Sequence, residues 1–300
     1  MLIRTHQLDD QQLNELDLLS ADCKRIDGNI IAVYKHLLGK DRTIPCNLLY
    51  YQQNQLIGFL STFFFYEDTC EIAMMVAPSH RRQGIASTML REIAAIIKAQ
   101  DVDMLAFSAP QGLNNQWLPV LGFQYLGSEY QMRRHQTKPL DITNKSLTVR
   151  LATPTDIPTL CAIDSVCFPQ QRADMPARFN ALLNDASYSI FIVNQDGVPV
   201  GKAHLSWQDV NVRLTDIAII PRAQGRGFGS ALIAHCINHS IVANKHDVIL
   251  EVETTNQNAL NLYTRLGFAI SNAHDYWTIP ANWLDRFSTP PLVLRNKTTG

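Results

Sequence analysis

The chain repeats one plan twice, and this internal duplication limits its fold more than any other feature. Short segments of the first half recur in the second half at offsets of 143 to 146 residues: Arg4 and Arg150, Gly58 and Gly201, Pro78 and Pro221, Gly122 and Gly267. A repeated sequence forms a repeated structural unit, so the 300 residues are expected to form two similar domains. A polar surface connector is expected over residues 133–146 and separates domain 1–140 from domain 147–300.

Composition excludes several classes of function. The 26 basic and 27 acidic residues leave a net charge of -1, which provides no overall field for nucleic acid or an anionic membrane. No apolar run approaches the roughly 18 residues that span a bilayer, and the acidic first twenty residues do not fit an export signal, so we expect a cytoplasmic protein. The six cysteines are scattered without a C-x-x-C pair, which argues against a disulfide framework or a zinc ribbon.

Periodicity predicts the same order of elements in each half. In the second half it indicates strand 148–151, helix 154–168 capped by Thr153, helix 175–184, a hairpin of strands 188–193 and 199–207, strand 212–220, helix 227–244 and strand 248–252. Asp196-Gly197 supplies the positive φ of the hairpin turn. The chain is therefore expected to contain two α/β domains.

A glycine-containing segment follows the fourth predicted strand of each half, and both copies fit Gln/Arg-x-x-Gly-x-Gly/Ala. Such a segment turns and opens a helix whose free N–H groups and positive dipole end converge, so it can hold a diphosphate. Glycine allows the phosphate oxygens to approach the backbone closely. The candidate residues are Arg81, Arg82, Gln83, Gly84, Ile85 and Ala86 in the first copy, and Gln224, Gly225, Arg226, Gly227, Phe228 and Gly229 in the second.

Two further motifs of the second half are Leu250-Glu251-Val252 and the segment 256–268, which reads Asn-Gln-Asn-Ala-Leu-Asn-Leu-Tyr-Thr-Arg-Leu-Gly-Phe. With these motifs and the two diphosphate segments, both halves resemble GCN5-related N-acetyltransferase (GNAT) domains, which transfer an acetyl group from acetyl-CoA to an amine. The resemblance covers nearly the whole chain. It implies a mixed α/β fold in which each domain has a twisted, largely antiparallel mixed sheet with flanking helices.

The resemblance also implies acetyl-CoA as cosubstrate, no metal, and specific sites. The strand residues Ile217, Ala218 and Ile219 would leave the next strand and hydrogen-bond the pantetheine arm, and Asn256 would contact the cofactor. Tyr263 stands at the position of the family's acid, which protonates the leaving thiolate. Glu251 resembles the base of members that acetylate the N-terminus of ribosomal proteins, while Glu253, Asp216 and Asp209 remain open as bases acting through water. The acceptor pocket would include Arg172, Asp174 and Arg178.

Structural interpretations of the same residues stand beside these functional ones. Tyr263 fits an ordinary half-buried aromatic, Glu251 a partner of a cation, and Asn256 a helix cap. His235 and His239 have the spacing of two metal ligands, but no third ligand is near in sequence, so a solvated helix face is expected. The basic run 133–135 is too short for nucleic-acid recognition and indicates a strand end or linker.

The two halves differ where the chemistry would occur. The positions of Tyr263 and Glu251 are occupied in the first half by Leu118 and Ala106, which cannot transfer protons. We therefore expect an N-acetyltransferase that acts on a primary amine in its second domain, with a structural or regulatory first domain. Two alternatives stay open: a CoA-binding sensor or interaction module without turnover, and catalysis in the first domain through Glu71 or Tyr66. The sequence does not reveal the amine acceptor, whether a small molecule or a protein. It also does not reveal the oligomeric state or the role of residues 280–300.

Overall fold

The computed structural model describes residues 1–142, 147–168 and 174–287, and the chain divides into two compact units. Unit 1 comprises Met1–Ser128 and Ala273–Gly300, and unit 2 comprises Glu129–Asn272. Within the described ranges, no helix is both long and apolar enough to cross a membrane.

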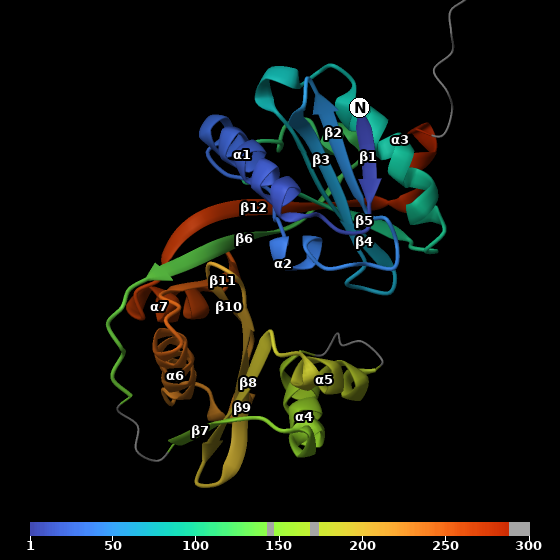
Figure 1. Cartoon of the computed structure of the whole chain (residues 1–300). Helices are drawn as coiled ribbons and strands as arrows, with labels where there is room; N and C mark the ends of the chain where they lie inside the picture. Colours follow the sequence, from blue (N-terminus) through green and yellow to red (C-terminus); the bar gives the residue numbers. More distant parts are fainter. Residues whose placement is uncertain (143–146, 169–173, 288–300) are drawn as a thin grey trace, which may run out of the picture. The chain divides into compact units, whose positions relative to one another are not determined.

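Unit 1 is a six-stranded sheet covered by helices on both faces (Figure 1). Its elements are β1 (Leu2–Thr5), α1 (Asp10–Asp27), α2 (Lys35–Leu38), β2 (Asn47–Gln52), β3 (Gln55–Phe63), β4 (Thr69–Val76), η1 (Pro78–His80), α3 (Ile85–Lys98), β5 (Met104–Pro110), η2 (Pro119–Leu121) and η5 (Ala281–Phe287). The strand order is β1-β2-β3-β4-β5-β12, and only β4 and β5 are parallel. The apolar stripe of α3, including Met89, Ile93 and Ile97, is buried in the core, as expected from its spacing.

Unit 2 repeats this plan. Its elements are β7 (Leu147–Leu151), η3 (Pro154–Asp156), α4 (Ile157–Cys167), α5 (Met175–Asn184), β8 (Tyr188–Gln195), β9 (Val198–Trp207), β10 (Val212–Ile219), η4 (Pro221–Ala223), α6 (Phe228–Val242), β11 (Asp247–Glu253) and α7 (Gln257–Arg265). The strand order is β6-β11-β10-β9-β8-β7, with β10 and β11 as the parallel pair. These elements confirm the sequence-based order closely, including the hairpin turn, where Asp196 and Gly197 have φ of 49° and 81°.

The last strand of each sheet comes from the other half of the sequence. The carboxy-terminal part of β12 (Ala269–Pro280) pairs with β5 in unit 1, and Glu129–His135 of β6 (Gln124–His135) pairs with β11 in unit 2. In Figure 1 the red β12 accordingly lies beside β5 of unit 1. The compact units therefore differ from the division at 1–140 and 147–300, because that division follows the duplication in sequence and the strand pairing does not.

The structure assigns two segments near the ends of the units. Residues 133–135 form the end of β6, which confirms the strand-end interpretation of the basic run, so the polar connector is shorter than the expected 133–146; the Arg134 side chain is buried. Its Nε donates to the Leu266 carbonyl at 3.0 Å, at the end of α7. Residues 281–287 form η5 and pack into unit 1, where Leu284 and Trp283 join the core, so this part of the carboxy-terminal segment stabilises unit 1. Residues 288–300 lie outside the described part of the chain.

Candidate active site

Both diphosphate segments open a helix at a glycine in the left-handed region. Gly84 precedes α3 with φ of 81°, and Gly227 precedes α6 with φ of 80°. Neither helix has a side-chain cap, so the N–H groups of its first turn have no acceptor within the helix. A Cβ added at either glycine would meet no protein atom within 4 Å. The glycines are therefore required by backbone conformation, and the space above both loops is open to a ligand.

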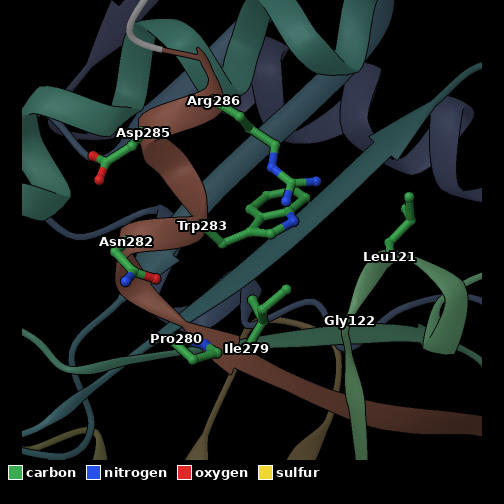
Figure 2. Close-up of a pocket in the computed structure, with 8 residues that line it drawn as sticks. All are labelled: Leu121, Gly122, Ile279, Pro280, Asn282, Trp283, Asp285 and Arg286. Atoms are coloured by element: carbon green, nitrogen blue, oxygen red, sulfur yellow. The ribbon is translucent and has the colours of Figure 1, made fainter.

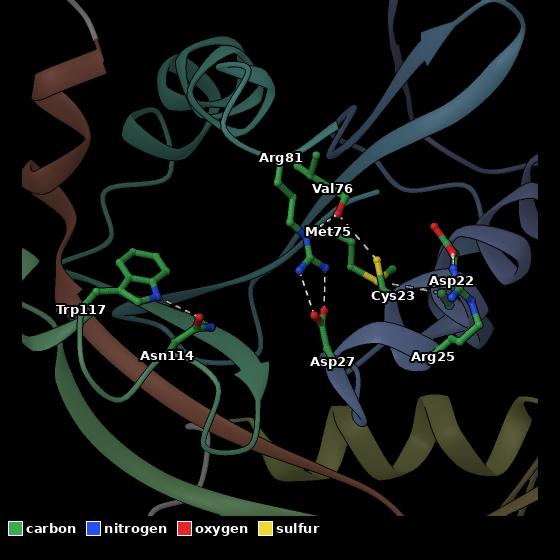
Figure 3. A network of polar contacts seen from close by, with 10 residues as sticks. Asp22, Cys23, Arg25, Asp27, Met75, Val76, Arg81, Asn114 and Trp117 are labelled. Carbon is green, nitrogen blue, oxygen red and sulfur yellow. Dashed lines mark hydrogen bonds and ion pairs between the residues drawn. The ribbon is translucent and has the colours of Figure 1, made fainter. Parts of the chain in front are cut away.

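The first residue of each segment ties the loop to the preceding strand. Arg81 donates from Nε to the Val76 carbonyl at 3.1 Å, and Gln224 donates from Nε2 to the Ile219 carbonyl at 2.9 Å. Arg81 also forms two hydrogen bonds with the buried carboxylate of Asp27, at 2.8 and 2.6 Å (Figure 3). These two side chains hold the loop, while the exposed Arg82 and Arg226 remain candidates for the diphosphate. The Arg226 guanidinium lies over the Phe228 ring at 4.9 Å.

The two parallel strands of unit 2 pair over only a short length. The recorded pairs are Val212 with Val248 and Arg213 with Ile249, although β10 continues to Ile219 and β11 to Glu253. Beyond Arg213 the edge of β10 that faces β11 is therefore open to another extended chain. Unit 1 shows the same feature, because β4 pairs with β5 only over Thr69–Ile72. This geometry matches the gap that the family resemblance implies next to Ile217, Ala218 and Ile219.

Tyr263 lies on α7, buried beside Phe268, with the ring centroids 6.0 Å apart. Burial raises the pKa of its phenol to about 12, because the phenolate loses solvation. The hydroxyl is therefore protonated at neutral pH and can donate a hydrogen bond. Its burial fits the structural interpretation as well, and its role as the acid stays a prediction.

Glu251 lies on β11 and forms an ion pair with Arg213 of β10. Gln131 of β6 also donates to its Oε1 at 3.5 Å. The pairing with a cation is thus confirmed, whereas the function of Glu251 as a base stays a prediction. Of the three other candidates, Glu253 and Asp209 are exposed and Asp216 is half-buried.

One face of the unit 2 sheet carries charged side chains that sequence reasoning missed. Lys202 and His204 lie on the face of β9 towards α4 and α5, where they contact Asp164 and Phe179, while Ala203 and Leu205 enter the apolar core on the other face. Lys202 Nζ lies 2.8 Å from Asp164 Oδ1 and 3.2 Å from His204 Nε2. The sequence pattern that indicates them is a lysine and a histidine two residues apart in a mostly apolar strand.

His204 predicts a pH dependence of stability. Burial, followed by the nearby charge of Lys202, lowers the pKa of the imidazole to about 3, so the folded protein keeps it neutral while the unfolded chain binds a proton near pH 6.5. Between these values the unfolded state binds more protons, so stability falls as the pH falls, by about 1 kcal/mol per pH unit. Urea unfolding from pH 6.5 to 4 should show a steeper loss for the wild type than for His204→Gln. Parallel curves would contradict this assignment.

In unit 1, the equivalents of the two candidate proton-transfer groups are apolar and buried, Ala106 and Leu118. The segment before Leu118 forms turns, with Trp117 Nε1 bonded to Asn114 Oδ1 at 3.0 Å (Figure 3), instead of a helix such as α7. Glu71 is buried and accepts from the Tyr34 hydroxyl at 2.9 Å, and that hydroxyl lies 3.1 Å from the hydroxyl of Tyr276 on β12.

The remaining predicted residues have structural contacts. Asn256 caps α7 and accepts from Ala259 N at 3.1 Å, and Asp174 caps α5. Arg178 pairs with Asp216 at 3.2 Å, while Arg172 lies outside the described residues. His235 and His239 both contact the Phe191 ring, with centroids 5.3 and 5.0 Å apart. Tyr66, the second candidate of the first half, is exposed.

A cavity of about 450 Å³ lies in unit 1 between the end of β12, η5 and the turn at Gly122 (Figure 2). Trp283, Arg286 and Ile279 contribute to its wall. None of the predicted cofactor or proton-transfer residues lines it. We therefore place the candidate active site at the diphosphate segment and the open edge of β10, not in this cavity.

Comparison with known proteins identifies the family. The profile of the acetyltransferase (GNAT) family matches residues 14–116 and again residues 157–268. The chain belongs to the GNAT family. It is an acyltransferase with two GNAT domains, and the mixed α/β fold expected for it is confirmed. Acetyl-CoA is the cosubstrate of this family.

Several relatives of this GNAT protein match it over most of its length. A mycothiol acetyltransferase of Mycobacteroides abscessus is 29% identical over 88% of this chain and 95% of its own length. A GCN5-related N-acetyltransferase from Sphaerobacter thermophilus has a TM-score of 0.74 at 12% identity, covering 93% of this chain and 96% of its own. A tandem GNAT protein of the clavulanic acid biosynthesis pathway has a TM-score of 0.67 at 13% identity, covering 94% and 98%. These two structures establish the fold shared with this chain.

Proposed function

We propose that this GNAT protein transfers the acetyl group of acetyl-CoA to a primary amine, and that unit 2 carries the reaction. The observation that supports this choice is the difference between the two units. Unit 2 combines an open diphosphate segment with Tyr263, Glu251 and Asp216, whereas unit 1 retains its segment but has Ala106 and Leu118 at the corresponding places. Unit 1 then acts as a structural or regulatory partner within the same chain.

The residues of unit 2 fit acetyl-CoA. The N–H groups at the start of α6 and the open space above Gly227 suit the diphosphate. The edge of β10 at Ile217, Ala218 and Ile219 can pair with the amides of the pantetheine arm as a neighbouring strand would. When bound, the cosubstrate supplies a thioester, which is an already activated acetyl group.

The chain's own residues address two demands of the reaction. The amine must be neutral to attack, which at pH 7 costs roughly 5 kcal/mol for a lysine side chain with a pKa of about 10.4 and much less for an α-amine near 8. A carboxylate of Glu251 or Asp216 can receive that proton through water. Tyr263 donates a hydrogen bond to the leaving sulfur. Burial makes a thiolate more basic, as it does a phenolate, so the leaving thiolate accepts this hydrogen bond more readily than it would in water.

The acceptor class includes small molecules and protein amines. The names of three tandem relatives point to mycothiol-type acceptors, so these belong in any panel of substrates. The near-neutral charge of the chain gives no reason to expect a polyanionic acceptor.

The function is tested by release of free CoA thiol from acetyl-CoA with a panel of primary amines. Tyr263→Phe removes the donor to the sulfur and is expected to lower kcat about 10²-fold with little change in the KM for acetyl-CoA. Tyr50→Phe, which removes the hydroxyl of a half-buried tyrosine of unit 1, serves as control. Unchanged turnover of the Tyr263 variant would remove that residue from the mechanism. CoA binding without transfer to any amine would favour the sensor alternative.

A further inference from the structure

Five charged or titratable side chains of unit 2 form a continuous chain, which we call the ionic cluster: Asp164 of α4, Lys202 and His204 of β9, Asp216 of β10 and Arg178 of α5. Lys202 Nζ bridges Asp164 Oδ1 at 2.8 Å and His204 Nε2 at 3.2 Å. His204 Nδ1 lies 3.5 Å from Asp216 Oδ2, and Arg178 donates to Asp216 Oδ1 at 3.2 Å.

The ionic cluster runs from the core to the surface. The side chains of Lys202, Asp164 and His204 are 0%, 1% and 1% exposed. The Asp216 side chain is 24% exposed and that of Arg178 is 42% exposed. The inner members are therefore fixed by burial, and only the Asp216–Arg178 pair is accessible to a ligand.

Lys202 also orients His204. An ammonium group only donates hydrogen bonds, so His204 Nε2 must accept and its proton must lie on Nδ1, towards Asp216. Phe179 adds to this support, because Lys202 Nζ lies 5.3 Å from its ring centroid and its ring contacts His204 edge-on. Lys202 thus fixes the ring of His204, whose Nδ1 lies 3.5 Å from the carboxylate of Asp216.

The backbone places Asp216 at the open edge of β10. The pairing of β9 with β10 shifts register between Thr215 and Ala218, and Asp216 has φ of 49° inside a strand. A non-glycine residue in this region is strained and persists when its surroundings hold it there, often at functional sites. Asp216 directly precedes Ile217, Ala218 and Ile219, so its carboxylate lies at the end of the segment proposed to hold the pantetheine arm.

The Arg178 guanidinium has N–H donors available for a ligand. Among the described residues, Asp216 is the one side chain that its guanidinium contacts, through a single nitrogen. Arg150, by contrast, uses both terminal nitrogens on one carboxylate, that of Asp156, at 2.8 and 2.7 Å. A guanidinium has five donors in a planar fork that matches a carboxylate, so Arg178 can bind an anionic group while it retains Asp216.

We propose that Asp216 and Arg178 form the acceptor-recognition pair of unit 2, and that the acceptor carries a carboxylate next to its amine, as an α-amino acid does. The inference rests on the proposed function. Asp216 accepts a hydrogen bond from the amino group, and Arg178 binds the carboxylate. The amino nitrogen forms the new C–N bond to the acetyl carbon as the C–S bond breaks. An acceptor that arrives as an ammonium ion loses two protons in total. One balances the proton that the CoA sulfur gains, and the other is released to solvent.

The test compares three forms of one acceptor. The free L-amino acids are screened by thiol release, and the best of them is compared with its carboxamide and with the amine that lacks the carboxyl group. In the wild type, kcat/KM for the amino acid should exceed that for either analogue about 10- to 100-fold. Arg178→Gln should abolish this preference, Arg178→Lys should restore part of it, and Arg265→Gln, which removes an exposed arginine without described contacts, should leave it unchanged.

Equal use of the carboxamide by the wild type, or an undiminished preference in Arg178→Gln, would overturn the inference while leaving the acetyltransferase function intact. Absence of transfer to every amine would instead overturn the proposed function. Calorimetry then tests the pair separately, with the same three compounds titrated into the complex with CoA. Binding of the amino acid that is weakened about 10-fold or more by Arg178→Gln would support the recognition pair. Equal binding of all three, or no binding, would reject it.

Discussion

Lys202→Met is expected to lower the free energy of unfolding by about 3–5 kcal/mol. Lys202 is fully buried, and its ammonium group is the cation that lies 2.8 Å from the equally buried Asp164 carboxylate. Removing the lysine leaves a charge in the interior, where its loss of solvation is no longer offset. Urea unfolding followed by circular dichroism measures the change.

Two further variants distinguish burial of an unpaired charge from simple loss of an ion pair. Lys202→Met combined with Asp164→Leu removes both charges and should recover at least half of the lost stability, because apolar replacements of buried pairs are often neutral or stabilising. Lys98→Met breaks an exposed pair with Asp285 and should cost no more than about 1 kcal/mol. A double variant as unstable as the single one would show that packing, not charge, dominates at this position.

Gly227→Asp is expected to weaken CoA binding to unit 2 about 10³-fold and to abolish most turnover. The added side chain occupies the open space above the loop and places a carboxylate against the diphosphate. Two unit charges about 4 Å apart repel by roughly 4 kcal/mol near a protein surface, which corresponds to about 10³ in affinity. Isothermal calorimetry with CoA measures the effect, alongside the thiol-release assay.

The matched control is Gly197→Asp in the hairpin of unit 2. Gly197 has φ of 81° and open surroundings, so the same substitution imposes the same backbone strain and adds the same charge away from the loop. It should retain CoA binding. Gly84→Asp places the same change in unit 1 and should preserve turnover. If Gly84→Asp abolished activity and Gly227→Asp did not, catalysis would belong to unit 1.

Local features of the fold could be predicted because they depend on neighbours in sequence. The tight hairpin turn demands positive φ, which Asp196 and Gly197 adopt readily, and the glycine-containing segments predict the turns that open α3 and α6. The periodicity of the long helices follows from the same short-range repetition. The exchange of β6 and β12 could not be predicted in this way, because it depends on pairing between strands that are far apart in sequence.

The candidate site likewise has parts that could be predicted from neighbouring residues in sequence and parts that depend on long-range contacts. Tyr263 and Gln224 stand in recognisable motifs, but the partner of Glu251 is Arg213, which lies 38 residues earlier in the chain. The ionic cluster joins α4, α5, β9 and β10, and no spacing within one element predicts that Lys202 would meet Asp164. Charges that are far apart in sequence come together only when the burial of the surrounding apolar residues brings their elements into contact.

The sequence by itself determined the duplication, the order of helices and strands, the two glycine loops and membership of a family, because these depend on residue type and on spacing along the chain. Tertiary structure alone decided which strand completes each sheet, which carboxylates are already paired with a cation, and that Lys202 is buried beside Asp164. The physical reason is that pairing and desolvation act through distance in space, and the linear order of residues does not contain that distance until the chain has folded.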